Sequence, residues 1–296
     1  MSGSDSRAAS ERLGVVTVAY RSEQVLPAFL ASIPQASTLP IMTVVVDNLP
    51  AEGRAHALAE HATASYLPMA ANLGYGGAMN AGVAALPEDI EWVLISNPDV
   101  VLSPGVLDNL LAVGKESKDI ASIGPALGNG DGSLYPSARA VPSIRTGIGH
   151  AMFTNLWPTN PWTRRYRNDA LVAERRDAGW LSGACVLVRR SAFDELGGFD
   201  TGFFMYFEDV DLGYRFGQLG YRNVYDPSVR VVHTGAHSTN SDSALMIAAH
   251  HASARRFLSK KYSGWWLWPV RTTLGLGLHV RSVIIGRRLT RQGENS

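Results

Sequence analysis

The chain has 296 residues, of which 46% are hydrophobic and 18% are charged. This composition is sufficient to bury the core of one large α/β domain or of two small ones. Lysine and arginine number 27 against 26 aspartates and glutamates, so the chain lacks the basic surplus of a dedicated nucleic-acid binder, and no nucleic-acid partner is expected. Any anionic ligand must therefore be met by a local group of residues.

The cysteine content and the N-terminal residues indicate the compartment. The single cysteine, Cys185, rules out an intramolecular disulfide and lies in an apolar run, where a buried thiol is expected. Residues 1–12 carry serines and charges of both signs without an apolar stretch, so we predict a disordered lead-in rather than a signal peptide. Both features favour a cytoplasmic location.

The chain between residues 13 and 96 alternates short β-branched runs with helical patterns, which is the order of βαβ units. The pattern predicts strands over Gly14–Ala19, Ile41–Val46, Ser65–Leu67 and Trp92–Ser96, with helices over Ser22–Ile33 and Gly76–Leu86. Ser22 is expected to cap the first helix. Four parallel strands are therefore expected by residue 96.

The pattern changes after a further helix, predicted over Ser103–Val113 with Pro104 in its first turn. It then predicts a hairpin over Gly124–Ala140, an irregular candidate lid over Val141–Arg176, strands over Trp180–Val188 and Val229–Val232, and helices over Glu208–Leu219 and Ser241–Lys260. Leu212, Phe216 and Leu219 form the expected apolar face of the helix over residues 208–219.

Acidic side chains follow two of the predicted strands. Asp99, in the sequence Asn97-Pro98-Asp99, follows the strand over 92–96, and Asp47 follows the strand over 41–46. Open α/β sheets bind ligands at such strand ends, so Asp99 is a candidate ligand of Mg²⁺ or Mn²⁺, and Asp47 is a candidate partner of a nucleoside. An Asx turn at Asp99 and helix capping at Asp47 are the structural alternatives.

The segment from Asn72 to Asn80 contains three glycines near a predicted helix start. Such glycines let backbone N–H groups approach a ligand closely. The segment is neither a GxGxxG fingerprint nor a Walker A loop, and the first strand is followed by Tyr20-Arg21-Ser22. A dinucleotide oxidoreductase and a P-loop NTPase are therefore disfavoured.

Three carboxylates, Glu208, Asp209 and Asp211, occupy the first turn of a predicted helix behind the aromatic run over 203–207. Dipole complementarity and capping account for one or two of them. Glu208 and Asp209 are sequence neighbours on different helix faces, so only one is expected to point at a reacting hydroxyl. That carboxylate would act as a general base, an effect of roughly 10² to 10⁴ in rate.

His233 ends the predicted strand over 229–232. A lone histidine is usually structural. Near a carboxylate site it would instead offer an imidazole to a metal ion, a choice that favours Mn²⁺ over Mg²⁺. The residues alone leave both roles open.

Taken together and in order, these segments resemble the inverting GT-A glycosyltransferases of family 2 over most of the range 14–238. The likeness lies in residues 15–20, 44–48, 72–82 and 97–99 of a donor half, and in residues 182–184, 197–200 and 208–211 of an acceptor half. It implies an α/β GT-A fold with a Rossmann-like, mostly parallel central sheet flanked by helices. Residues 13–240 would form this domain, with 13–115 binding the nucleotide sugar and 116–240 the acceptor.

The resemblance also implies roles for single residues. The nucleoside contacts would be Thr17, Ala19, Arg21 and Asp47, and the ribose and diphosphate contacts would be Asn72, Gly74, Gly77 and Asn80. Asp99 and His233 would hold the metal ion, with the diphosphate completing its coordination because Asn97 replaces the first acid of the usual Asp-x-Asp motif. Asp209 is our choice for the base, with Glu208 orienting the site and Asp211 ordering the turn; Asn97, Gly183 and Asp211 complete the predicted substrate-binding set.

Within the family, residues 97–100 and 204–212 resemble bacterial rhamnosyltransferases. This likeness implies a dTDP-β-L-rhamnose donor and a polyprenyl-diphosphate-linked GlcNAc acceptor, as in the synthesis of a cell wall linker. The alternatives are a transferase for another dTDP or UDP sugar, a non-catalytic nucleotide-sugar-binding module, and a nucleotidyltransferase. The carboxylates and His233 favour an enzyme. The oligomeric state is left open, and a homo-oligomer is one of the outcomes allowed.

Residues 241–296 are predicted to form a helical, amphipathic C-terminal segment. Trp265, Trp266 and Trp268 precede a stretch that contains five arginines, and aromatic and cationic side chains together suit a membrane interface. Charged and polar residues interrupt the apolar run after Trp265, so the segment is not expected to span the bilayer. Peripheral association with the inner face of the cell membrane is the functional expectation, and packing on the domain is the alternative.

Overall fold

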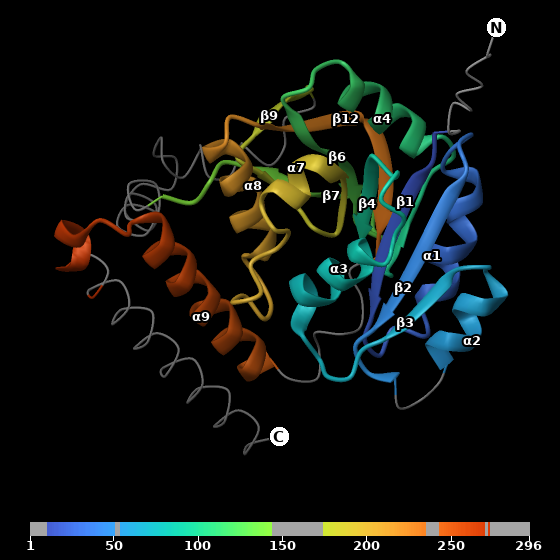
Figure 1. The fold of residues 1–296 in the computed structure, drawn as a ribbon, viewed down its shortest axis with the longest axis horizontal. Coiled ribbons are helices and arrows are strands. Elements are labelled where there is room, and N and C mark those ends of the chain that lie inside the picture. Colours follow the sequence, from blue (N-terminus) through green and yellow to red (C-terminus); the bar gives the residue numbers. More distant parts are fainter. Residues whose placement is uncertain (1–10, 51–53, 144–173, 235–242, 270–271, 273–296) are drawn as a thin grey trace, which may run out of the picture.

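The computed structural model describes residues 11–50, 54–143, 174–234, 243–269 and 272. A twisted central sheet runs through the molecule with helices on both faces (Figure 1). Its strand order is β3-β2-β1-β4-β11-β6-β12-β5, with β7 beside β6 and β9 beside β12. Most of the candidate lid, residues 144–173, and most of the predicted disordered lead-in, residues 1–10, lie outside the described residues.

The first part of the sheet contains the four strands that the sequence predicts up to residue 96, all parallel. They are β1 (Leu13–Ala19), β2 (Ile41–Asp47), β3 (Ser65–Pro68) and β4 (Trp92–Ser96). Every residue of β1 and β4 is buried, because helices cover both faces of this part of the sheet. Continuous apolar runs are the sequence signature of such strands, and the prediction is confirmed here.

The helices between these strands are α1 (Leu26–Ser32), which is continued by the short 3-10 turn Ile33–Gln35, α2 (Arg54–His61) and α3 (Gly74–Ala84). The predicted cap by Ser22 is wrong. The carbonyl of Ser22 accepts the N–H groups of Val25 and Leu26, and Val25 holds the cap position of α1 without a side-chain hydrogen bond. The helix therefore begins later than expected, with Pro27 in its first turn, where proline is tolerated.

The elements that follow β4 make the sheet mixed rather than mostly parallel throughout. They are β5 (Val100–Val101), α4 (Val106–Lys115), β6 (Ile120–Gly128), β7 (Leu134–Tyr135), β9 (Arg176–Ala178), β11 (Cys185–Arg189), α7 (Arg190–Glu195), α8 (Glu208–Gln218) and β12 (Arg222–His233). Strand β11 is antiparallel to both β4 and β6, while β12 is parallel to β6 and antiparallel to β5. Strands β8 (Ala138–Arg139) and β10 (Trp180–Leu181) form a separate pair.

Several predicted boundaries after β4 are wrong. Pro104 precedes α4 rather than entering it, because Gly105 adopts a φ of 69° at the cap position. The strand predicted over 180–188 is broken between β10 and β11, and the strand predicted over 229–232 is the end of the much longer β12. Leu219 is 49% exposed, because it follows α8 at a turn and so leaves the apolar face.

Two main cores lie on opposite faces of the sheet. One is packed by α1, α2 and α4, and the other by α3, α7 and α8. Cys185 lies in the first core, where burial raises the pKa of its thiol to about 12. The predicted buried thiol is therefore confirmed.

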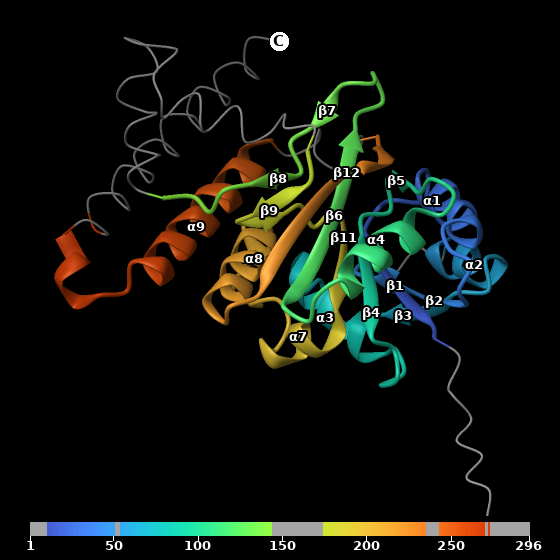
Figure 2. The ribbon, with the colours of Figure 1, turned by 90° about the horizontal axis from the view of Figure 1, so that it is seen from above.

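A third, smaller cluster joins α9 (Ser243–Lys261) to the rest of the molecule, with Phe257 packed against Phe203 and Val210. Helix α9 lies at one edge beside α8 in both views of the ribbon (Figures 1 and 2). The short turn η3 (Trp265–Leu267) follows it. Among the described residues, no helix combines the length and the apolar character needed to cross a membrane.

Candidate active site

The carboxyl ends of β1 and β2 bring Ala19 opposite Asp47. One oxygen of Asp47 accepts the N–H of Leu49 at 2.8 Å, and the other accepts the hydroxyl of Tyr66 at 2.9 Å. Burial and this bond to a carboxylate raise the pKa of Tyr66 to about 12. Sequence reasoning missed Tyr66, which fixes the orientation of the predicted nucleoside ligand.

The other predicted nucleoside contacts differ in how they are placed. Thr17 and Ala19 are buried in β1, and the hydroxyl of Thr17 has no hydrogen-bond partner among the described residues. Arg21 is exposed and has a φ of 52°, a left-handed conformation that costs a non-glycine residue about 1–3 kcal/mol. Its guanidinium lies 5.6 Å from the ring centroid of Tyr20. Of the three, Arg21 is the one whose side chain faces solvent.

The glycine segment over residues 72–80 packs closely against other residues of the chain. Gly74 has a φ of 72°, and a Cβ there would lie 2.1 Å from the carbonyl oxygen of Phe204. The side-chain oxygen of Asn72 accepts the N–H of Gly74 at 2.9 Å, and a Cβ on Gly77 would lie 2.9 Å from the Cβ of Leu73. The need for glycine at 74 and 77 is thus explained by contacts within the chain.

Asn80 also has structural partners within the chain. Its amide nitrogen donates to the carbonyl of Phe199 at 2.9 Å, and its amide oxygen accepts the N–H of Phe199 at the same distance. Both ends of the side chain are therefore occupied by one backbone position of the acceptor half. In the structure Asn80 ties α3 to the segment around Phe199, and its contact with the ribose or diphosphate stays a prediction.

Asp99 and His233 meet because β5 and β12 pair antiparallel, with His233 opposite Val100. The N–H and hydroxyl of Thr234 both donate to the carbonyl of Asp99, at 3.0 and 3.1 Å. The Nε2 atom of His233 lies 3.2 Å from Oδ1 of Asp99, and the ring of Tyr135 packs edge-on against the imidazole at 5.6 Å. The two predicted metal ligands are therefore adjacent.

The chemistry of this pair fits a divalent cation. Oδ1 of Asp99 and Nδ1 of His233 are buried without a hydrogen-bond partner among the described residues, so polar atoms remain for a ligand. A carboxylate with an imidazole is a donor set suited to Mn²⁺. In the described part of the chain, no group of three or more His, Cys, Asp or Glu residues has metal-binding geometry, so this pair does not complete a coordination shell. The backbone of Asn97, beside it, donates to Ala184.

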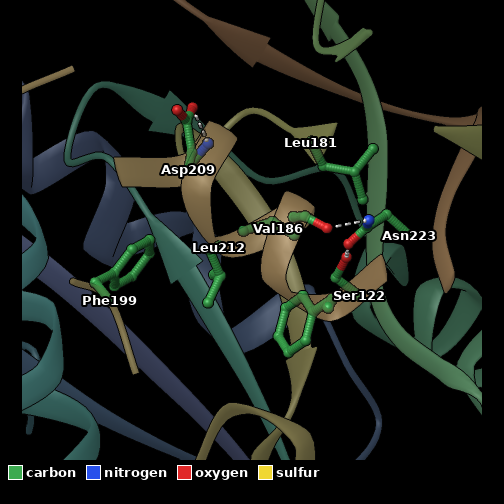
Figure 3. Close-up of a pocket in the computed structure, with 10 residues that line it drawn as sticks. Ser122, Leu181, Val186, Phe199, Asp209, Leu212 and Asn223 are labelled. Carbon is green, nitrogen blue, oxygen red and sulfur yellow. Dashed lines mark hydrogen bonds between the residues drawn. The ribbon is translucent and has the colours of Figure 1, made fainter. Parts of the chain in front are cut away.

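The carboxylate of Asp209 is held by backbone N–H groups. Its Oδ2 accepts the N–H of Gly183 at 3.1 Å, and its Oδ1 accepts the N–H of Val210 at 2.8 Å. Figure 3 shows Asp209 at a pocket whose other lining side chains include Leu212 and Phe199. The wall beneath this carboxylate is therefore largely apolar.

Glu208 and Asp209 share one electrostatic environment. Burial, and then the charge of Asp209, raise the pKa of Glu208 to about 8. Burial also raises the pKa of Asp209, but the N–H groups of Gly183 and Val210 oppose this by stabilising the ionised form. Both carboxyls therefore resist ionisation, and Asp209 is the one whose charged form is favoured by the N–H groups of Gly183 and Val210.

Tyr75 connects the two halves at this point and was missed by sequence reasoning. Its hydroxyl donates to the carbonyl of Gly183 at 2.6 Å, so the same peptide segment contacts both Tyr75 and Asp209. Burial and the charges of Glu208 and Asp209 raise the pKa of Tyr75 well above its ordinary value. The available signal was that Tyr75 is the one aromatic residue in the glycine segment over 72–80.

Asp211 is not placed to touch a substrate. Its side chain is fully buried, with the Nε of Arg215 and the Nζ of Lys260 each 2.6 Å from a carboxylate oxygen. We therefore correct its place among the predicted substrate-binding residues. The geometry agrees with its other predicted role, which is to order the first turn of α8.

Parallel strands with acidic residues at their carboxyl ends, continued in one mixed sheet by strands that bring in a buried carboxylate pair, are the arrangement expected of a glycosyltransferase with the GT-A fold. Residues 14–197 match the profile of Glycosyl transferase family 2. The chain belongs to this family, so the family and fold predicted from the sequence are confirmed.

Two relatives of the chain are rhamnosyltransferases. The chain is 43% identical over 290 residues to the N-acetylglucosaminyl-diphospho-decaprenol L-rhamnosyltransferase of Mycobacterium tuberculosis, covering 95% of this chain and 94% of the relative. It is 32% identical over 197 residues to the rhamnosyltransferase WbbL of Escherichia coli, covering 64% of this chain and 71% of that protein. The first match spans both the donor half and the acceptor half.

Two solved structures share the fold at low sequence identity. One is the mannosyltransferase PcManGT from Pyrobaculum calidifontis in complex with GDP-Man and Mn²⁺, with a TM-score of 0.57 and 15% identity over 93% of this chain and 72% of that one. The other is GalNAc-T7 with UDP, GalNAc and Mn²⁺, with a TM-score of 0.54 and 17% identity over 76% of this chain and 44% of that one.

Proposed function

We propose that the chain transfers L-rhamnose from dTDP-β-L-rhamnose to a polyprenyl-diphosphate-linked N-acetylglucosamine, with inversion at the anomeric carbon. The observation that carries this proposal is the 43% identity, over nearly the full length of both chains, to a relative named for rhamnosyl transfer to N-acetylglucosaminyl-diphospho-decaprenol. Because the match extends through the acceptor half, it supports the acceptor as well as the sugar.

Asp209 is the general base of this proposal. Inversion needs a single displacement, in which one carboxylate takes the proton of the acceptor hydroxyl as its oxygen attacks. The N–H groups of Gly183 and Val210 hold that carboxylate in one orientation, and its burial makes it a stronger base than an exposed aspartate. The raised pKa of Glu208 favours its protonated form, which limits charge repulsion between the two neighbouring carboxyls.

Asp99 and His233 are the proposed ligands of Mn²⁺ or Mg²⁺. When bound, the ion would neutralise the charge that develops on the departing dTDP diphosphate. The support is the close pairing of the carboxylate with the imidazole, together with the lack of any hydrogen bond to Oδ1 of Asp99 or Nδ1 of His233 among the described residues. Mn²⁺ in the two solved structures of the same fold agrees with this choice.

The donor nucleotide is proposed to lie over the carboxyl ends of β1 and β2. Asp47, oriented by Tyr66, would accept a hydrogen bond from the base or ribose, and Arg21 would reach the nucleotide from the rim. A hydrolysis screen across dTDP, UDP and GDP sugars tests the donor. Preference for a UDP or GDP sugar would contradict the dTDP-rhamnose assignment.

Association with the inner face of the cell membrane is also proposed, through the residues after Ser263. Trp265, Trp266 and Trp268 are 83%, 66% and 60% exposed, which is unusual for tryptophan and suits insertion at a lipid interface. A chain ending at Ser263 should sediment less with anionic vesicles than the full chain, with neutral vesicles as the control. Equal sedimentation of the two chains would leave packing as the role of these residues.

The deciding experiment for the chemistry compares three variants at neutral pH. Asp209→Asn keeps the shape but removes the proton acceptor, so kcat should fall by roughly 10² or more, while calorimetric binding of dTDP with Mn²⁺ changes little. Glu208→Gln should lose less activity. Asp194→Asn, the same change at an exposed position on α7, is the control. An active Asp209→Asn beside an inactive Glu208→Gln would reverse the two roles.

Metal dependence is tested separately. Exhaustive EDTA treatment should abolish transfer, and added Mn²⁺ should restore it. Asp99→Ala should weaken dTDP binding in the presence of Mn²⁺ without loss of cooperative unfolding, because the side chain lies at a strand end outside the cores. Full turnover after EDTA would rule out the proposed metal site.

A further inference from the structure

Two consecutive residues ahead of α8 have a left-handed backbone although neither is glycine. Tyr206 has a φ of 67° and Phe207 a φ of 66°, and Phe207 holds the cap position of α8. Each such residue costs about 1–3 kcal/mol and persists only where the surrounding structure imposes it. Asp209 follows two residues later, so the path of this turn decides where its carboxylate points.

Helix α9 makes apolar and polar contacts with this turn. The hydroxyl of Ser253 donates to the carbonyl of Met205 at 2.8 Å, directly before the left-handed pair. Phe257, one of the largest fully buried side chains, packs with Phe203 and Val210 on either side of the turn. The strained segment is therefore covered by a helix from a later part of the chain.

Lys260 of α9 joins the two ends of the same segment. Its Nζ lies 2.7 Å from Oδ2 of Asp200, ahead of the turn, and 2.6 Å from Oδ1 of Asp211, beyond it. Asp211 is fully buried and also pairs with Arg215, while Asp200 also pairs with Arg256. A buried carboxylate that loses one of its cationic partners is left partly uncompensated, which is strongly unfavourable.

We propose that α9 is a positioning element for the catalytic carboxylate and that Lys260 is its principal positioning residue. This inference rests on the proposed role of Asp209 as the base. Lys260 closes the segment over 200–211 by bridging its ends, and Phe257 and Ser253 hold its middle. Released from this bridge, the left-handed pair can relax, and Asp209 then moves relative to Gly183, whose N–H fixes its present orientation.

The test uses the full-length chain with Lys260→Met, which removes the charge but keeps the length, and Lys260→Arg, which keeps the charge. Arg255→Met removes a positive charge from an exposed position of the same helix and is the matched control. Three quantities are measured: kcat and KM for transfer, the calorimetric Kd for dTDP with Mn²⁺, and hydrogen exchange of the peptides covering residues 200–211 and, as a control in α2, 54–61.

Lys260→Met should lower kcat at least tenfold, leave the dTDP Kd within about threefold, and speed exchange over 200–211 but not over 54–61. Lys260→Arg should recover most of the kcat, and Arg255→Met should match the wild type. Unchanged exchange over 200–211, or a kcat within twofold of the control, would overturn the inference while leaving the proposed function intact. If the wild-type chain transfers no sugar, the proposed function fails, and the exchange measurement alone decides whether Lys260 holds the segment.

Discussion

Glu208→Gln should change how the stability of the folded chain depends on pH. Burial and the neighbouring Asp209 raise the pKa of Glu208 from 4.5 to about 8, so the folded chain binds a proton that the unfolded chain releases. The protonated group stabilises the fold fully below pH 4.5, and this contribution is lost as the pH rises through about 8. At about 1.4 kcal/mol per pH unit, the loss between pH 5 and pH 8 is about 3 to 4 kcal/mol.

The assay is urea unfolding followed by tryptophan fluorescence at pH 5, 6, 7 and 8. Wild type should lose stability across this range, whereas Glu208→Gln, which carries a neutral amide at the same place, should lose less by a few kcal/mol. Glu88→Gln makes the same change at an exposed position and should follow the wild-type curve. If the wild-type and Glu208→Gln curves are parallel within about 0.5 kcal/mol, the buried, protonated Glu208 inferred here is wrong.

Three further variants test contacts between the two halves. Tyr75→Phe should lower kcat about tenfold with little change in dTDP affinity, because it removes the hydrogen bond to the carbonyl of Gly183. Tyr221→Phe, remote from the site, is the control and should behave as wild type. If Tyr75→Phe and wild type transfer sugar at equal rates, Tyr75 does not position the base. Gly74→Ala should lower the urea midpoint of unfolding by an amount equal to more than about 1 kcal/mol of stability, because a Cβ at this position would lie 2.1 Å from the carbonyl oxygen of Phe204. An unchanged midpoint would contradict this. Asn80→Ala should lower the free energy of unfolding by about 1–3 kcal/mol, because two hydrogen bonds to Phe199 are lost. Unchanged stability with weakened dTDP binding in calorimetry would contradict this and support the predicted ligand role.

The donor half was predictable because its signals are local. Strands β1 and β4 are apolar runs bounded by polar residues, and the acids at the end of β2 and after β4 mark the carboxyl edge of the parallel strands. The resemblance to a family gave the order of the motifs. What the sequence did not indicate were the partners of those acids, such as Tyr66 on Asp47, because such a bond depends on the register between β2 and β3.

Contacts within the chain give two of the predicted ligand residues structural partners that the sequence did not indicate. Asn80 and Asp211 are polar residues in recognisable motifs, and a motif indicates only that the residue type matters. Each is occupied by a partner far along the chain, Phe199 for Asn80 and Lys260 for Asp211. Partners separated by 119 residues, as in the first pair, cannot be inferred from the spacing of residues along the sequence.

The reversed strand β11 explains how the acceptor half reaches the donor site. Because β11 is antiparallel to β4, its first residue, Cys185, lies opposite Ser96, the last residue of β4. The chain that leads into β11 therefore arrives at the carboxyl edge, where the N–H of Asn97 donates to Ala184 at 2.9 Å and where Gly183 meets Asp209. A parallel β11 would bring that loop to the opposite edge of the sheet, away from Asp99. Buried parallel strands and buried antiparallel strands both appear in a sequence as apolar runs. The direction of β11 relative to β4, on which this site depends, is therefore set by packing and cannot be predicted from the local pattern.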